Sequence, residues 1–218
     1  MSAHPPTDPT VAPPSSSGAA PAHGTPPRVC VFCGSHAGAD ERYAAAARAF
    51  GTLLGRRGQA LVYGGARSGL MGAVADAALE AGGRVTGIIP GALWEREIGH
   101  TGLSELLVVE SMHERKALMA ERSDAFVTLP GGAGTLEEFF EAWTWAQLGI
   151  HGKPVGLLNV GGFYDPLLAL VDHMAREGFV RPQQRAMVLV DDEPAALLDR
   201  LAAYRPPSTT RWLTEAET

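Results

Sequence analysis

The stretch LPGGAGTLEE, residues 129–138, joins a short apolar segment to an acidic segment with a helical pattern. The preceding residues, AFVT at 125–128, are apolar and β-prone, as expected for a buried strand. The glycines then break the strand and permit a tight turn in which several N–H groups face one point. A turn of this kind at the start of a helix favours an anion. These ten residues therefore predict a strand–turn–helix unit and a phosphate-binding loop.

The two carboxylates after the turn allow two interpretations. Thr135 and Glu138 have the spacing of a capping box, in which both side chains satisfy free N–H groups at the start of a helix. Glu137 and Glu138 would, however, repel the phosphate that the glycine loop attracts. If the loop does bind phosphate, a carboxylate there should bind sugar hydroxyls, stabilise a positively charged ribosyl group or activate water.

Apolar runs alternate with helical patterns along the rest of the chain. This alternation predicts an α/β fold, a Rossmann-like doubly wound parallel sheet of about seven strands flanked by helices. The expected strands are residues 29–33, 60–63, 84–89, 106–109, 125–129, 155–159 and 187–190. The expected helices are residues 40–57, 69–82, 111–122, 136–149, 164–177 and 193–204. We expect a single domain over residues 28–204, a disordered tail rich in proline, serine and alanine over 1–27, and a C-terminal extension over 205–218.

Three loops that follow expected strands are rich in glycine. They are CGSHAG (33–38), GGARSGLMG (64–72) and PGGAGT (130–135). Ligands of such sheets bind beyond the carboxyl ends of the strands, so three loops at one edge predict a site for a nucleotide-sized ligand that carries phosphate. None of the loops matches the G-x-G-x-x-G dinucleotide fingerprint or the Gly-Lys-Ser/Thr of a P-loop. A dehydrogenase and an ATPase are therefore disfavoured.

Two further charged segments are candidates for the site. Arg115 and Lys116 fall in the first turns of an expected helix, where the helix dipole favours acidic side chains. Such a pair is either solvated at the surface or ready to bind an anion. The triplet ERE at 95–97 falls in a stretch expected to be irregular, and it is either an exposed charged loop or part of the site.

Composition argues against several classes of function. The formal net charge of −6 lacks the basic excess of proteins that bind nucleic-acid polymers. No apolar run reaches the length of a membrane span, and no signal peptide is evident. Cys30 and Cys33 face opposite sides of an expected strand, which predicts core residues in a protein of the reducing cytoplasm. The seven histidines are scattered without ligand spacing, so no metal is expected.

Several motifs, taken in chain order, resemble those of one family. PGGAGTLEE matches the signature P-G-G-x-G-T-x-x-E, and MHERK matches its arginine–lysine partner motif. VFCGS, LVYGG, GLMG and WAQLGIHGKPVGLLNVGGFYDPLL match the same family in the same order. From about Val29 to about Val190 the chain resembles the Lonely-guy family of cytokinin-activating phosphoribohydrolases, whose older label is lysine decarboxylase.

The resemblance implies a Rossmann-like homodimer or higher oligomer with its pocket close to the subunit interface. It implies cleavage of the N-glycosidic bond of a nucleoside 5′-monophosphate, either an N6-prenylated AMP or AMP, into free base and ribose 5-phosphate, without a cofactor. The family's catalytic residues fall on Arg115 and Glu138. Its substrate contacts fall on Gly34, Ser35, Glu97, Met112, Lys116, Gly131, Gly132, Ala133, Gly134, Thr135, Glu137 and Thr144.

Three positions depart from the residues that are usual in the family. Ala66 replaces a glycine, Glu114 replaces a glutamine, and Ala133 replaces a residue that is often aromatic in plant members. None of these changes removes a catalytic group. They leave open the preferred N6 substituent, and with it the choice between a cytokinin activator and a general AMP nucleosidase.

Two competing functions follow from the same residues. A pyridoxal-phosphate decarboxylase needs a lysine for the Schiff base, and Lys116 and Lys153 are the two lysines of the chain. A Rossmann-like protein that binds a nucleotide or a cofactor without hydrolysis needs the glycine loops, but not Arg115 together with Glu138. The presence of both favours the hydrolase.

Overall fold

The structure, a computed structural model, describes residues 27–97 and 99–207, and of residues 95–97 it describes only the backbone. The strands are β1 (Arg28–Phe32), β2 (Ala60–Tyr63), β3 (Val85–Pro90), β4 (Glu105–Val109), β5 (Ala125–Thr128), β6 (Val155–Leu158) and β7 (Val188–Asp191). The helices are α1 (Glu41–Arg56), α2 (Gly69–Glu80), α3 (Gly91–Glu97), α4 (Met112–Glu121), α5 (Ala133–Gln147), α6 (Asp165–Arg176), α7 (Pro182–Arg185) and α8 (Pro194–Ala203), with a 3-10 turn at Val160–Gly162.

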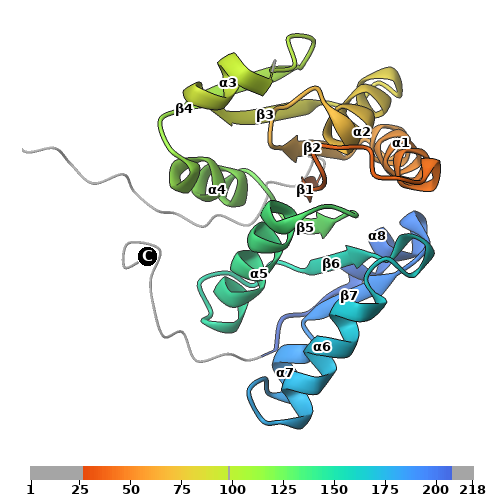
Figure 1. The fold of residues 1–218 in the computed structure, drawn as a ribbon, viewed down its shortest axis with the longest axis vertical. Coiled ribbons are helices and arrows are strands. Elements are labelled where there is room, and N and C mark those ends of the chain that lie inside the picture. Colours follow the sequence, from red (N-terminus) through yellow and green to blue (C-terminus); the bar gives the residue numbers. More distant parts are fainter. Residues whose placement is uncertain (1–26, 98, 208–218) are drawn as a thin grey trace, which may run out of the picture.

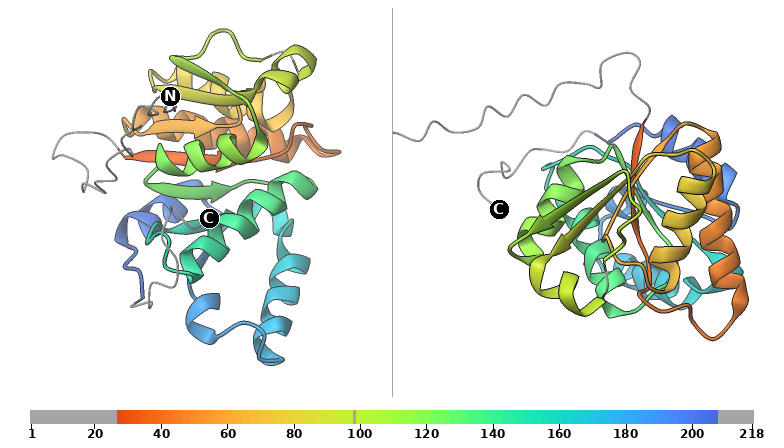
Figure 2. Two further views of the ribbon diagram at one scale, coloured as in Figure 1. Left: turned by 90° about the vertical axis from the view of Figure 1, so that its left-hand side faces the viewer. Right: turned by 90° about the horizontal axis from the view of Figure 1, so that it is seen from above.

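The seven strands form one parallel sheet with helices on both faces (Figures 1 and 2). Their order is β4-β3-β2-β1-β5-β6-β7, and each expected strand agrees with an observed one to within a residue at either end. The predicted doubly wound α/β fold is therefore confirmed. The predicted tail and C-terminal extension lie outside the described residues, apart from Pro27 and residues 205–207.

Each face of the sheet has its own apolar core. One core packs α1, α2 and α8 against the sheet and contains Phe50 and Leu197, and the other packs α4, α5 and α6 and contains Phe126 and Trp143. Cys33 belongs to the first core and Cys30 to the second, which confirms that the two thiols face opposite sides. Within the described residues, no helix is both long and apolar enough to cross a bilayer.

The strand order reverses between β1 and β5. The chain moves outward from β1 to β4 at one edge and then returns to pair β5 with β1, with Val29 beside Ala125 and Phe32 beside Thr128. The loops that follow these two strands therefore leave the sheet side by side. In doubly wound sheets this reversal point is where a ligand-binding crevice forms.

Three local expectations about helices were wrong. The stretch 91–97, expected to be irregular, forms α3, and α7 was not expected at all. The packing of the Trp94 ring against the backbone of Gly99 accompanies α3, and a contact of that kind leaves no periodic pattern in a seven-residue segment. Helix α5 begins at Ala133, three residues before the expected start at 136.

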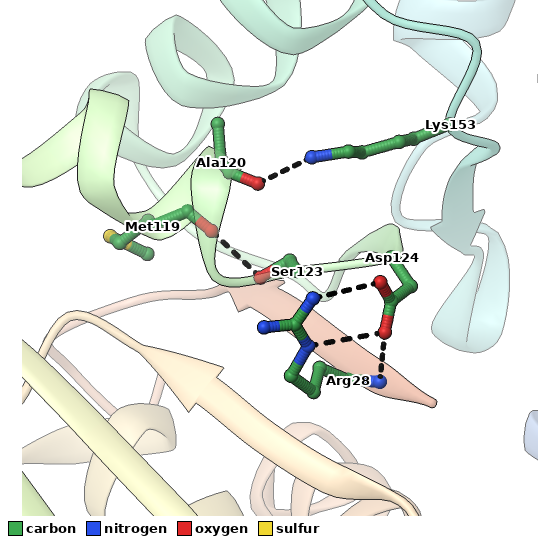
Figure 3. A network of polar contacts seen from close by, with 6 residues as sticks. All are labelled: Arg28, Met119, Ala120, Ser123, Asp124 and Lys153. Carbon is green, nitrogen blue, oxygen red and sulfur yellow. Dashed lines mark hydrogen bonds and ion pairs between the residues drawn. The ribbon is translucent and has the colours of Figure 1, made fainter. Parts of the chain in front are cut away.

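A polar network fixes the amino ends of β1 and β5, away from the reversal point (Figure 3). Asp124 accepts hydrogen bonds from the backbone N–H of Arg28 at 2.8 Å and from its guanidinium at 3.0 and 3.3 Å. Beside it, Ser123 Oγ and Lys153 Nζ donate to carbonyls in the last turn of α4. Burial opposes ionisation of Asp124, but the hydrogen bonds from Arg28 lower its pKa below the ordinary value.

We predict that Asp124→Asn lowers the free energy of unfolding at pH 7 by about 1–2 kcal/mol, because the charge-assisted hydrogen bonds are lost. A carboxyl with a lowered folded-state pKa stabilises the fold above its unfolded pKa of about 3.9, and this contribution is lost as the pH falls through the folded-state value. Urea unfolding at pH 7 and at about pH 2.5 measures this effect. The difference between the variant and the wild type should shrink at the lower pH. An equal loss from Asp192→Asn, at an exposed position, would contradict the assignment to the Arg28 pair.

Candidate active site

A cavity of about 550 Å³ lies at the reversal point, at the carboxyl ends of β1, β2 and β5. The predicted site residues that line it are Gly34, Ser35, Met112, Arg115, Gly131, Gly132, Ala133, Gly134, Thr135, Glu137 and Glu138. Lys116 and Thr144 are not among the residues that line the cavity, although both are described. Glu97 ends α3, and its side chain lies outside the described part of the chain.

The backbones of the three glycine loops are in close contact at the carboxyl ends of the strands. A Cβ added to Gly69, whose φ is +58°, would lie 2.3 Å from the carbonyl carbon of Ser35. A Cβ added to Gly131 would lie 2.1 Å from Thr135 Oγ1 and 2.9 Å from the backbone nitrogen of Gly34. No other residue type fits these two positions without displacing a neighbouring loop, so the glycines are required by close approach.

The start of α5 has no side-chain cap. Its N-cap is Gly132, and Thr135 is the third residue of the helix, so the predicted capping box of Thr135 and Glu138 is wrong. By contrast, α1 is capped by Asp40 and α4 by Ser111, each accepting a hydrogen bond from the first turn of its helix. The first N–H groups of α5, at the lining residues of the PGGAGT loop, therefore remain available to a ligand in the cavity.

Glu114, one of the departures from the family pattern, helps to begin α4. Its backbone N–H donates to Ser111 Oγ at 3.1 Å, and its carboxylate accepts from the backbone N–H of Glu110 at 2.8 Å. This arrangement differs from a capping box, because the carboxylate accepts from Glu110, the residue before the N-cap Ser111, and not from Ser111 itself. It fixes the first turn of α4, which carries Arg115.

Arg115 is buried at the wall of the cavity with 7% of its surface exposed. Its Nε donates to the carbonyl oxygen of Ile88 and one Nη to that of Gly64, both at 3.1 Å, and the other Nη lies 3.6 Å from Met112 Sδ. The interpretation of the Arg–Lys pair as a solvated surface feature is therefore wrong. Two backbone carbonyls hold the guanidinium, and its positive charge has no carboxylate partner among the described residues.

Lys116 is also buried, but it turns to α5 instead of the cavity. Its Nζ lies 2.5 Å from Glu137 Oε1 and 3.0 Å from Glu141 Oε1. Burial opposes its charge, yet the hydrogen bonds with the two carboxylates raise the pKa of Lys116 above the ordinary value. The pair of ion contacts also ties α4 to α5 beside the cavity.

Glu138 is the most strongly perturbed acid of the site. Its pKa is raised to about 7, chiefly by burial, with a smaller contribution from the carboxylates of Glu137 and Glu141, whereas the charges of Arg115 and Lys116 lower it. No described residue donates a hydrogen bond to its carboxylate. Glu138 lies one helical turn beyond Gly134, so its side chain continues the face of α5 that begins with the free N–H groups.

The lysines do not suit a Schiff-base mechanism. A nucleophilic lysine needs a neutral amine, whereas the raised pKa of Lys116 keeps it protonated between two carboxylates. Lys153 Nζ donates to the carbonyl oxygen of Ala120 at 2.6 Å, at the end of α4 and away from the cavity lining. Among the described residues, no group of three or more His, Cys, Asp and Glu side chains is placed to hold a metal ion.

Several cavity residues were not predicted as site residues. They are chiefly apolar or aromatic: His36, Tyr43, Met71, Leu93, Met119 and Phe163. The rings of Tyr43 and Phe163 meet edge to face, 5.5 Å apart, although they lie on α1 and just after the 3-10 turn. The GGFYD segment was part of the resemblance but suggested no role for Phe163, and Tyr43 carries no local signal.

We predict that Gly64→Ala displaces Arg115, because a Cβ at position 64 would lie 1.8 Å from its Nη2. The loss of a hydrogen bond to a buried cation should lower the free energy of unfolding by about 2 kcal/mol. A crystal structure of the variant should show the guanidinium moved away from the carbonyl of Ile88.

Gly134→Ala is the matched control, because its added Cβ meets no atom within 4 Å and alanine is the better helix former. It should leave the stability unchanged or slightly higher. An unmoved guanidinium in the Gly64→Ala structure would contradict the prediction.

Known proteins of similar sequence establish the family of this chain. A sequence model of the family described as "Possible lysine decarboxylase" matches residues 71–201. The chain is 51% identical over 179 residues to the cytokinin riboside 5′-monophosphate phosphoribohydrolase LOG5 of Arabidopsis thaliana, covering 82% of this chain and 78% of that protein. It is 49% identical over 197 residues to the cytokinin riboside 5′-monophosphate phosphoribohydrolase of Rhodococcoides fascians, covering 89% of this chain and 97% of that protein.

Solved structures share the fold. The Moco carrier protein of Chlamydomonas reinhardtii superposes with a TM-score of 0.63 at 24% identity, covering 82% of this chain and 98% of that one. Identity this low shows the architecture alone, whereas the two hydrolases are similar over most of their length. The chain therefore belongs to the Lonely-guy family of phosphoribohydrolases, as its motifs predicted.

Proposed function

We propose that this protein hydrolyses the N-glycosidic bond of cytokinin riboside 5′-monophosphates, which are N6-prenylated forms of AMP, and of AMP itself. Water adds to C1′ of the ribose, the bond to the base breaks, and a proton passes to the base, giving free base and ribose 5-phosphate. One observation carries the proposal: the uncapped start of α5, the Arg115 guanidinium and the partly buried Glu138 carboxylate line a single cavity. The relatives named as phosphoribohydrolases support the same reaction.

The 5′-phosphate binds, in this proposal, at the start of α5. Gly132, Ala133, Gly134 and Thr135 all line the cavity there, and within residues 27–97 and 99–207 no side chain caps this end of the helix. The helix dipole and these donors favour an anion. The loop after β1, with Gly34 and Ser35, closes the other side of the same space.

Glu138 then acts at the ribose. As the base departs, positive charge builds up on the sugar, and an ionised carboxylate close by stabilises it or takes a proton from the attacking water. A pKa of about 7 leaves a substantial fraction of Glu138 ionised at neutral pH and makes it an effective proton acceptor there. Both roles, stabilising the charge on the ribose and taking a proton from water, require a negatively charged carboxylate, which an amide of the same shape cannot replace.

Arg115 supplies a fixed positive charge on the cavity wall. Because Ile88 and Gly64 hold two of its nitrogens, the guanidinium is oriented before a substrate arrives. From this position it favours the ionised form of Glu138. It is also suited to assist the departing base.

Three predicted substrate contacts are less directly supported. Thr144 is exposed on α5 and does not line the cavity, and the side chain of Glu97 is not described. Lys116 is paired with carboxylates. Their contact with a substrate remains a prediction.

We predict that Glu138→Gln lowers the rate of base release about 10²–10³-fold, the usual cost of removing a general base or a preorganised charge. The assay incubates the wild type and the variant with AMP and with isopentenyladenosine monophosphate, separately and without added metal. Chromatography then measures free base and ribose 5-phosphate. The ratio of the two rates in the wild type gives the preference for a prenylated substrate.

The matched control is Glu80→Gln, an exposed glutamate of α2 outside the cavity lining, which should keep the wild-type rate. Full turnover by a folded Glu138→Gln protein would remove Glu138 from the chemistry. A wild type that binds both nucleotides but releases no base would instead be a nucleotide-binding protein.

We also propose a homodimer or higher homo-oligomer in the cytoplasm. Met112 lines the cavity yet leaves 41% of its surface exposed, and nearby Val108 leaves 57% exposed, as expected of apolar side chains that a second copy covers. The two buried free thiols suit a reducing compartment. Sedimentation equilibrium should give at least twice the chain mass of 22.9 kDa, and a mass of one chain at micromolar concentration would contradict the oligomer.

A further inference from the structure

Lys116 lies beside the cavity without lining it, and its positive charge is paired with carboxylates of the protein. The side chain comes from α4, is only 9% exposed, and reaches two carboxylates of α5. Glu137 is 55% exposed at the rim of the cavity, and Glu141 is 25% exposed one turn further along the helix. A buried lysine shared by two acids is a costly arrangement, so its effect on the neighbouring groups needs an explanation.

The two acids flank Glu138 on α5. Glu137 precedes it directly and Glu141 follows three residues later, so both bring negative charge close to the Glu138 carboxylate. The other charged groups that face Glu138 are Arg115 and Lys116, both from α4. The thiols of Cys30 and Cys33 lie within electrostatic range of Glu138 on opposite faces of the sheet, and burial raises the pKa of each, which keeps them uncharged.

We infer that Lys116 is a positioning residue for the proposed hydrolysis. By pairing with Glu137 and Glu141 it offsets their negative charge, and the Glu138 carboxylate can then be ionised beside them. This inference rests on the proposed function, since it concerns the carboxylate that the reaction uses. It assigns the lysine an electrostatic role through two neighbours, which is distinct from contact with the substrate.

The physical reason is the mutual repulsion of three carboxylates within one and a half turns of helix. A like charge nearby disfavours ionisation, so Glu137 and Glu141 each raise the pKa of Glu138, whereas Lys116 lowers it. Arg115 already favours the ionised form from a fixed position on two carbonyls, so it cannot move to replace the lysine. Without Lys116 the acids would be unpaired and Glu138 would hold its proton to a higher pH.

The test measures kcat/KM for base release from AMP as a function of pH, whose acid limb reports groups of the free enzyme. The wild-type limb should have its midpoint near pH 7. Lys116→Met should move it upward by about one pH unit, and Glu141→Gln should move it downward by about half a unit. Lys116→Arg keeps the charge and should stay close to the wild type. The ionisation of the substrate phosphate is common to all four proteins, so it does not affect the differences.

A second readout does not depend on turnover. Carbon-13 NMR titration of glutamate side chains in the free protein follows the ionisation of Glu138 directly, and Glu138→Gln identifies its resonance. The midpoint should again move upward in Lys116→Met and downward in Glu141→Gln. A merely structural role of the lysine predicts lower stability in the variants, but not shifts of opposite sign.

The outcomes separate the two proposals. Opposite shifts of the Glu138 midpoint support the inference, and an unchanged midpoint with a raised KM in Lys116→Met overturns it in favour of direct contact between the lysine and the substrate. If Lys116→Met does not fold, Glu141→Gln decides, because it leaves Lys116 its bond to Glu137. A wild type without base release overturns the proposed function alone, and the NMR titration then still decides the role of Lys116.

Discussion

The backbone of Gly34 holds the three glycine loops together through its N–H and its carbonyl oxygen, and the cavity depends on these two hydrogen bonds. Its N–H donates to the carbonyl oxygen of Pro130, and its carbonyl oxygen accepts from the N–H of Leu70, both at 3.0 Å. These bonds are possible because β1 lies between β2 and β5 in the sheet, so the loop after β1 has one of the other loops on each side. Glycine at 69 and 131 lets the backbones approach closely enough to form them. The strand order thus determines that the start of α5 faces the other two loops.

The sequence predicted the sheet well because most strands, namely β1, β2, β3, β5 and β6, are buried along nearly their whole length. Such strands appear in the sequence as short uninterrupted apolar runs, such as ALVY in β2 and AFVT in β5. The glycine loops mark where these strands end. The starts of helices were harder to predict. At α5 the residue types favoured Thr135 as a cap, but the close contact of Gly131 with Gly34 and Thr135 makes Gly132 the N-cap. That contact joins segments about a hundred residues apart, which no local pattern records.

The same distinction applies to the site. The third glycine loop and Glu138 could be identified from one segment, because both belong to the PGGAGTLEE motif. The burial and the bonding partners of Arg115 and Lys116 could not be identified in this way. Arg115 is bound by carbonyls 27 and 51 positions away in the chain, and Lys116 by carboxylates 21 and 25 positions away. From the sequence alone, two basic residues at the start of a helix were interpreted either as a solvated surface pair or as a pair ready to bind an anion, and neither interpretation included the pairing of Lys116 with carboxylates.

The fold also explains how carboxylates can stand beside an anion-binding loop. Glu137 is held by Lys116, so its charge is balanced at the rim of the cavity. Glu138 has no such partner, but burial raises its pKa to about 7, which removes part of its charge before a substrate binds. In the proposed reaction the phosphate would therefore meet free N–H groups and a weakened negative field. When positive charge develops on the ribose, it favours the ionised form of the same carboxylate, so the interaction is stronger in the transition state than in the ground state, which is the condition for it to accelerate the reaction.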